Sequence, residues 1–104
     1  MDHDQVADSL AELGNRHRLA VFRFLVKAGY DGASVGEIQK ALGIPASTLS
    51  HHLARMAKVG LIRQEKRSRT IICIPEYGHL EQLLSFLKDE CCTGIGADTT
   101  QHGQ

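Results

Sequence analysis

The residues best suited to bind a ligand are three cysteines, two of them adjacent. Cys91 and Cys92 follow an apolar helical stretch, and Cys73 lies earlier, among isoleucines. Sulfur is a soft donor that favours thiophilic metals and metalloids. Neighbouring Cα atoms are ~3.8 Å apart, below the usual range for a disulfide, so a bond within the pair would be strained. The pair is interpreted as a ligand site. Cys73 is either a third sulfur donor or a small core residue.

A second set of residues suits contact with a polyanion. Leu49, Leu53 and Met56 recur at helical spacing and are expected to face the core. His52 is expected to pack or hydrogen-bond near that buried side. Short polar and basic side chains, suited to phosphates and base edges in a major groove, fall elsewhere on the same helix: Ser47, Thr48, Ser50, His51 and Arg55.

Two consecutive helices position this set. Ser34 stands three residues before Glu37, a capping box that predicts the start of the first helix, and Gly43 predicts its end. Pro45 suits the first turn of the second helix, where a missing N–H costs nothing. Gly60 is expected to end that helix. The spacing predicts a helix-turn-helix.

A basic hairpin is expected directly after the second helix. Its strands are predicted at about Leu61–Glu65 and Arg69–Ile74, and the later strand is rich in β-branched residues. A hairpin in this place is a wing. Lys66, Arg67 and Arg69 lie at or beside its tip, where they are predicted to contact phosphates and to fix register without reading sequence.

Further helices are expected at both ends of the chain. Two N-terminal helices are predicted around Val6–Leu13 and Leu19–Val26, and a last helix covers about Glu76–Cys91. The last helix carries a leucine stripe at positions 80, 83, 84 and 87. The expected fold class is mainly α with a small β-hairpin, in one domain over residues 1–92. The tail, 93–104, is rich in glycine and threonine and is predicted to be disordered.

The charge distribution favours nucleic acid although the net charge is zero over 104 residues. Residues 1–14 contain four acids and no lysine or arginine, whereas residues 55–69 contain six lysines and arginines against Glu65 alone. Phosphate affinity depends on the charges of the contacting face. Nothing resembles a signal peptide or a membrane span, so the chain is expected in the cytoplasm with reduced thiols. Such a small core is often completed by oligomerisation.

These segments together resemble the ArsR (ArsR/SmtB) family of metal- and metalloid-responsive repressors. The resemblance covers about residues 6–92 and rests on LGNRHRLAVFRFL, ALGIPASTLSHHLARMAKVGLI and the wing RQEKRSRTIICI. It implies a winged helix-turn-helix homodimer that binds a double-stranded DNA operator and leaves it when an inducer binds. No resident cofactor is expected. Two-fold symmetry would match two half-sites about one helical turn apart, or a multiple of that spacing.

The inducer is the most variable property of such repressors. The family's Cys-x-Cys arsenic site has no counterpart here, since Ser34-Val35-Gly36-Glu37 stand in its place. The zinc pattern on the last helix is also missing. The cysteines resemble a subgroup of arsenic sensors with a C-terminal cysteine pair, some of which respond to methylated arsenicals. This resemblance implies a trivalent arsenical as inducer, arsenite or methylarsenite, with antimonite as another candidate, and Cys91, Cys92 and Cys73 as its ligands.

The three sulfurs are expected far apart within one chain, because a helix over 76–91 spans ~24 Å at 1.5 Å per residue. If the last helices pair antiparallel in a dimer, Cys73 of one subunit would approach the cysteine pair of the other. Inorganic arsenic binds three thiolates and a monomethylated form binds two. The acidic helix end, with Asp89 and Glu90, is expected to raise the thiol pKa values.

Two alternatives keep some of these features. The same fold could act as a thiol redox, persulfide or zinc-responsive repressor, and a thiol-rich metalloid buffer would need no DNA. The basic helix and wing argue against the buffer. The sequence contains no nucleophile–base–acid spacing, phosphate loop or HExxH motif, so no enzymatic activity is expected.

Overall fold

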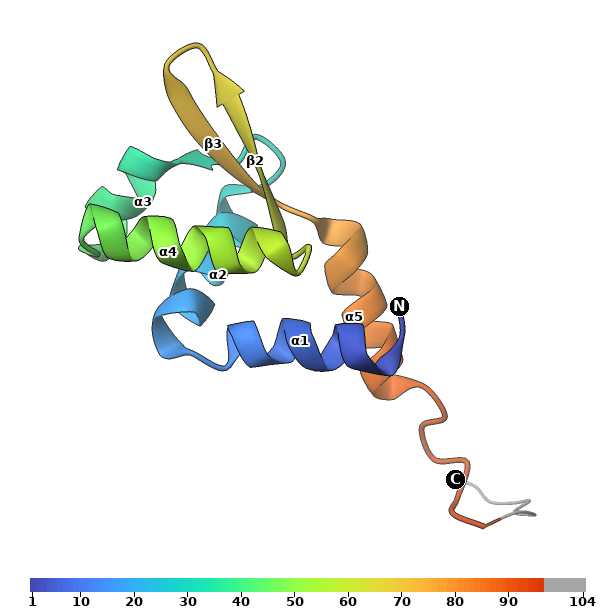
Figure 1. The fold of residues 1–104 in the computed structure, drawn as a ribbon. Helices are drawn as coiled ribbons and strands as arrows, with labels where there is room; N and C mark the ends of the chain where they lie inside the picture. Colours follow the sequence, from blue (N-terminus) through green and yellow to red (C-terminus); the bar gives the residue numbers. More distant parts are fainter. Residues whose placement is uncertain (97–104) are drawn as a thin grey trace.

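The computed structural model describes residues 1–96 of the chain (Figure 1). Its elements follow one another in the order α1 (His3–Leu13), α2 (Arg16–Ala28), β1 (Ala33–Ser34), α3 (Val35–Leu42), α4 (Ala46–Lys58), β2 (Ile62–Arg67), β3 (Thr70–Pro75) and α5 (Tyr77–Lys88). The predicted winged helix-turn-helix is confirmed: α3 and α4 form the helical pair, and β2 and β3 form the wing that projects beyond them. No helix within 1–96 is long and apolar enough to cross a membrane.

The predicted signals at the ends of α3 are confirmed. The Ser34 hydroxyl accepts a hydrogen bond from the Glu37 amide at 3.0 Å, and the Ser34 amide donates to the Glu37 carboxylate at 2.8 Å. Gly43 ends the helix in the left-handed region, with φ of 66°, where glycine is favoured. Pro45 immediately precedes α4 as its N-cap. Local chemistry therefore determines where the helix-turn-helix begins, turns and restarts.

The sheet contains a strand that the sequence pattern did not predict. The strands of this antiparallel sheet lie in the order β1-β3-β2, so β3, the second strand of the wing, is the central strand of the sheet. Cys73 pairs with Ala33 on one side and with Gln64 on the other. A two-residue strand such as β1 has no periodicity of its own, because it exists through its pairing partner.

The wing is longer and its turn tighter than predicted. Strand β2 continues to Arg67, and Arg67 pairs with Thr70, which leaves Ser68 and Arg69 as the connection. Ser68 adopts a φ of 60°, in the left-handed region that costs most L-residues about 1–2 kcal/mol. The hairpin thus carries its basic residues out to its very end.

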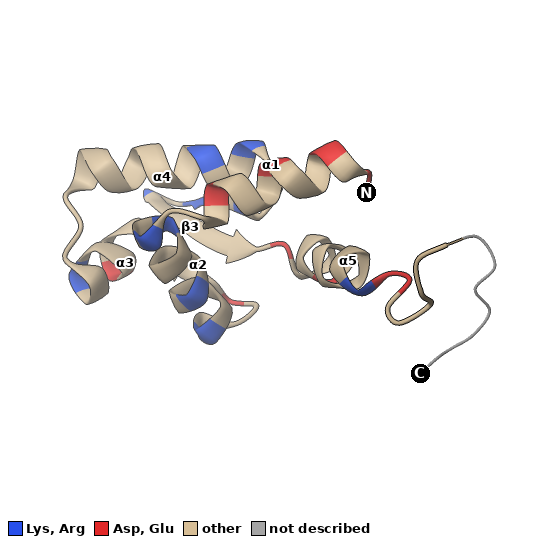
Figure 2. Ribbon diagram, turned by 90° about the horizontal axis from the view of Figure 1, so that it is seen from below, with Lys and Arg blue, Asp and Glu red and all other residues tan. Residues whose placement is uncertain are grey.

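Helix α5 ends earlier than predicted, at Lys88 instead of Cys91. Asp89 has an extended backbone, and Glu90 and Cys92 have φ values of 59° and 66°, so the helical hydrogen-bonding pattern cannot continue through the cysteines. The segment after the helix extends away from the rest of the molecule (Figure 2). The predicted disorder of 93–104 falls mostly on residues 97–104, which lie outside the described residues.

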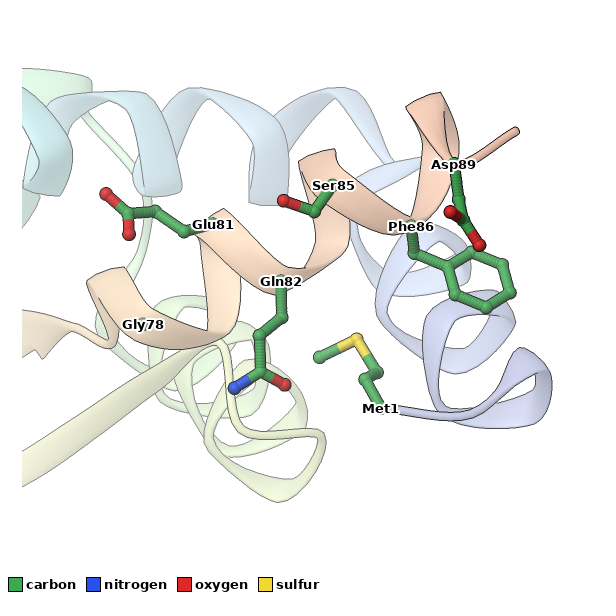
Figure 3. A pocket seen from close by; sticks show the side chains of 7 residues that line it. All are labelled: Met1, Gly78, Glu81, Gln82, Ser85, Phe86 and Asp89. Atoms are coloured by element: carbon green, nitrogen blue, oxygen red, sulfur yellow. The ribbon is translucent and has the colours of Figure 1, made fainter. Parts of the chain in front are cut away.

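The apolar face of α5 is only partly covered in the single chain, where Leu80 packs against the core. Of its leucine stripe, Leu83 is buried, whereas Leu84 and Leu87 remain 53% and 55% exposed. The N-terminus lies near this helix: Met1 lines a pocket together with residues of α5 that include Gln82 and Phe86 (Figure 3). A hydrogen bond of 2.8 Å between Ser9 Oγ and His79 Nε2 also joins α1 to α5.

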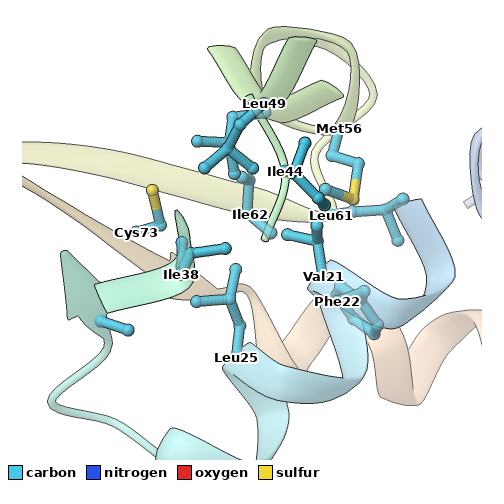
Figure 4. Close-up of a cluster of buried hydrophobic side chains, with 12 residues drawn as sticks. Val21, Phe22, Leu25, Ile38, Ile44, Leu49, Met56, Leu61, Ile62 and Cys73 are labelled. Carbon is cyan, nitrogen blue, oxygen red and sulfur yellow. The ribbon is translucent and has the colours of Figure 1, made fainter. Parts of the chain in front are cut away.

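The core lies between the helices and the sheet (Figure 4). Val21, Phe22 and Leu25 of α2 pack there against Ile38 of α3. The predicted stripe of α4, the connection that follows it and the strands contribute the other members: Leu49, Leu53, Met56, Leu61, Ile62 and Cys73. Burial of such side chains contributes about 1.5–3 kcal/mol each. This core holds α4 with its polar face outward.

Candidate nucleic-acid interface and thiol site

The outer face of α4 carries the residues predicted to contact DNA. The apolar stripe of the helix is buried as expected, and the predicted contact residues are all exposed: Ser47, Thr48, Ser50, His51 and Arg55. Since the helix presents small hydroxyls and an imidazole along its length, a major groove can approach it closely.

His52 lies on the buried side, as predicted. The Arg18 guanidinium of α2 donates to His52 Nδ1 at 3.3 Å, so the ring accepts through that nitrogen. Burial and then the charge of Arg18 lower the pKa of His52. The imidazole therefore stays neutral near pH 7, and it ties α4 to α2 behind the exposed face.

The wing and α4 border a common groove. Ser50 of α4 lines it together with Arg69 and Thr70 of the wing and with the start of α3, Ser34–Gly36. Two elements that are separate in sequence thus form one surface. The predicted contact residues Ser50 and Arg69 therefore border the same groove.

The wing's cations differ in how far they are already neutralised. Glu65 accepts hydrogen bonds from Arg63 and Arg67, each at 2.9 Å, and both arginines lower the pKa of its carboxyl. Lys66 and Arg69 form no ion pair with any residue in 1–96. Their charges are consequently the most available to phosphates.

Arg55 forms an ion pair with α1, on the side of α4 away from the wing. Its Nε and Nη2 donate to the two carboxylate oxygens of Glu12 at 2.8 and 3.2 Å. This bidentate pair lowers the pKa of Glu12, mainly through the hydrogen bond. Figure 2 shows acidic residues on α1 beside basic residues of α4. Arg55 is exposed, as a DNA-contacting residue must be, but it is paired.

The cysteine pair forms a second candidate site beyond the end of α5. Cys91 Sγ and Cys92 Sγ are 2.9 Å apart, and both residues are exposed. The hydrogen bond with Cys91 raises the pKa of Cys92. The expected direction holds for Cys92, but the first cause is the neighbouring thiol rather than the charge of the helix end.

Cys73 is not brought to this pair within the chain. It is fully buried among core residues, 0% exposed, with its sulfur 3.8 Å from the Gln64 amide nitrogen. Burial raises the pKa of its thiol. No group of three metal-ligating side chains within 1–96 could hold a metal ion. A site made from one chain therefore has two sulfurs.

Several residues at this surface were missed in the sequence. Glu12 was counted only as part of an acidic segment, and Arg18 and Ser9 carried no signal at all. Each acts through a partner far along the chain: Glu12 with Arg55, Arg18 with His52, and Ser9 with His79. Spacing within a helix cannot identify such partners.

Known proteins share this fold and parts of this sequence. A family model described as a helix-turn-helix domain matches residues 13–65. The HTH-type transcriptional regulator YgaV of Escherichia coli is 30% identical over 89 residues, which covers 86% of this chain and 88% of YgaV. The crystal structure of the ArsR family transcriptional regulator RHA00566 has a TM-score of 0.73 at 22% identity, over 86% and 90% of the two chains.

A third similar protein is a homodimer. The homodimeric winged helix-turn-helix domain of Mb0332 from Mycobacterium bovis, a possible ArsR-family regulator, has a TM-score of 0.66 at 26% identity, over 84% of this chain and 81% of that one. Fold, contact surface and relatives define a DNA-binding transcriptional regulator with a winged helix-turn-helix. The chain belongs to the helix-turn-helix family whose model it matches and is related to HTH-type transcriptional regulators, and it shares its fold with ArsR-family regulators of known structure.

Proposed function

We propose that the protein is a homodimeric repressor that leaves its operator DNA when Cys91 and Cys92 bind a trivalent arsenical. The observation that carries the proposal is the pair of exposed sulfurs, 2.9 Å apart, beyond the end of α5. Two soft donors at this spacing can reach one thiophilic atom together. Since α5 also carries the uncovered leucines, a ligand bound here would act next to the surface where two subunits can meet.

The chemistry suits thiols that are protonated before the ligand arrives. In methylarsenite, arsenic carries one methyl group and two hydroxyls. Each thiol replaces one hydroxyl, so two As–S bonds form, two As–O bonds break, and the thiol protons leave with the hydroxyls as two waters. The raised pKa of Cys92 supports this assignment, because each departing hydroxyl needs a proton. A peroxide sensor, by contrast, requires a low-pKa thiolate.

A methylated arsenical fits the two-sulfur site better than inorganic arsenite does. Arsenite would need a third thiolate, and Cys73 is buried in the core of its own chain. For Cys73 to serve a site on the partner, strand β3 would have to open, with loss of core packing. The binding of a methylated species requires no such change.

Release from DNA requires a dimer on a two-fold symmetric site. Leu10 of α1 with Leu84 and Leu87 of α5 supplies exposed apolar area for pairing, and the related Mb0332 domain is homodimeric. In such a dimer each α4 would contact a major groove through Ser47, Thr48, Ser50 and His51, with Lys66, Arg67 and Arg69 on flanking phosphates.

A thiol redox switch is the second candidate, because the same sulfur contact would bring two thiols together for oxidation. It differs in its trigger: peroxide or persulfide would release the DNA without any metalloid.

A gel-shift titration on the DNA upstream of the protein's own coding sequence tests both. Methylarsenite, arsenite, antimonite, zinc and peroxide are added separately to the wild type, to Cys91→Ser/Cys92→Ser and to Cys73→Ala. We expect release by near-stoichiometric methylarsenite in the wild type and in Cys73→Ala, and none in the double variant. Loss of the arsenite response alone in Cys73→Ala would identify a third sulfur. Release by peroxide but by no arsenical would replace the proposal with the redox switch.

A further inference from the structure

An acidic side chain of α1, Glu12, forms an ion pair with Arg55 of α4, the helix predicted to contact DNA. Glu12 accepts from Nε and Nη2 of Arg55 at 2.8 and 3.2 Å, and its side chain is only 14% exposed, whereas that of Arg55 is 47% exposed. The two residues come from different elements, α1 and α4. Their pairing is therefore a property of how α1 packs against α4, and it ends if the helices separate.

Glu12 is itself held in place. Nε of Arg18 lies 3.2 Å from its carboxylate and donates to its backbone carbonyl at 2.6 Å. Arg18 is buried and also donates to His52 of α4. The carboxylate is thus a fixed acceptor, and the longer, more exposed Arg55 side chain is the partner that can leave.

The pair draws Arg55 to the edge of α4 that lies away from the wing. On that edge Arg55 and Glu12 line a groove with Asp8 of α1 and Lys58 of α4. The opposite edge, at Ser50, borders the groove shared with the wing. Arg55 therefore points toward α1 and not toward the surface formed by α4 and the wing.

We propose that Glu12 withholds Arg55 from the DNA backbone and that separation of α1 from α4 releases it as an additional phosphate contact. Glu12 then determines how many phosphates α4 neutralises. The inference rests on the DNA-binding part of the function and is independent of the inducer.

The physical basis is competition between two anions for one cation. A guanidinium already paired with a carboxylate brings no net charge to the duplex, so it displaces no counterion. A released guanidinium that neutralises one phosphate steepens the slope of log affinity against log salt by about 0.9. The change in slope therefore measures the number of phosphate contacts, and it does not depend on the base sequence of the duplex.

The same pair connects DNA affinity to the position of α5. Helix α1 is fastened to α5 through Ser9 and His79, and the rings of His3 and Phe86 lie 6.2 Å apart. A displacement of α5 that carries α1 with it moves Glu12 relative to Arg55. Occupancy of a site near α5 can thereby change the charge that α4 offers to DNA.

Four variants test the proposal: Glu12→Gln, Arg55→Gln, the double variant, and Asp8→Asn as the matched control. Asp8→Asn removes one negative charge from α1 on the same groove but breaks no ion pair formed within 1–96. Binding to a fluorescent duplex of arbitrary sequence is measured by anisotropy over a salt series. We expect Glu12→Gln to steepen the slope by about 0.9 per bound subunit. Asp8→Asn and Arg55→Gln should leave it unchanged, and the double variant should return it to the wild-type value.

Two results would overturn the proposal. A slope that flattens by about 0.9 per subunit in Arg55→Gln alone means that Arg55 contacts phosphate while it is paired. A slope in Glu12→Gln equal to that in Asp8→Asn means that Glu12 withholds nothing. Thermal unfolding of each variant shows whether it is folded. If Glu12→Gln is not, Arg55→Gln decides alone, because it leaves the contact between Glu12 and Arg18 intact. Failure of every arsenical to release DNA would not affect either result.

Discussion

Replacing Lys66 and Arg69 by glutamine should remove the strongest phosphate contacts of the wing. Neither residue forms an ion pair within 1–96, whereas Arg67 shares Glu65 with Arg63. If each of the two contacts one phosphate, a dimer loses four contacts, and the slope of log affinity against log salt should become shallower by about 3.6. Raising the salt from 50 to 200 mM should therefore weaken DNA binding by the wild type about 150-fold more than it weakens DNA binding by the double variant.

Fluorescence anisotropy with the operator and with a scrambled duplex measures this effect. The loss should be similar for both duplexes, because phosphate contacts position the protein without reading bases. Arg67→Gln, the matched control at the same tip, should change the slope less, since its charge is already partly neutralised by Glu65. The reasoning is refuted if Arg67→Gln equals or exceeds the effect of the double variant, or if the operator loses affinity while the scrambled duplex does not.

Two further predictions concern stability. In the folded state the pKa of His52 is lower than its ordinary value of about 6.5. As the pH falls through that value, the unfolded state therefore binds more protons than the folded state. The free energy of unfolding should decrease between pH 7.5 and 5.5 for this reason. Urea unfolding at the two pH values should show a smaller decrease in His52→Asn; an equal decrease would exclude this histidine as the cause. Ser68→Gly should raise the free energy of unfolding by about 0.5–1 kcal/mol, because glycine adopts the φ of 60° without steric cost. A decrease in that free energy would show that the serine stabilises the turn.

The helix-turn-helix could be predicted because its determinants are local. The Ser34–Glu37 capping box and Gly43 act within one turn of helix, and the Leu49–Leu53–Met56 stripe repeats at the period of the helix itself. The exposure of the residues predicted to contact DNA follows from the same period, since a helix that buries one face must present the other.

The cysteines illustrate where local reasoning stops. Their adjacency in sequence already made Cys91 and Cys92 a candidate pair. The end of α5 at Lys88, the left-handed backbone of Cys92 and the resulting sulfur contact depend on how the chain leaves the helix. Cys73 is buried in a core formed by several elements and pairs with Ala33 of β1, a two-residue strand that no sequence pattern marks.

The sequence by itself determined the class of protein, through caps, periodicity and a basic wing that each operate over a few residues. The tertiary structure alone decided which charges are free to meet DNA, because Glu12 and Arg55 stand 43 positions apart and meet only when α1 packs on α4. Helical periodicity specifies which face a side chain occupies. The residue that it contacts across that face depends on packing between elements distant in sequence, which no local pattern predicts.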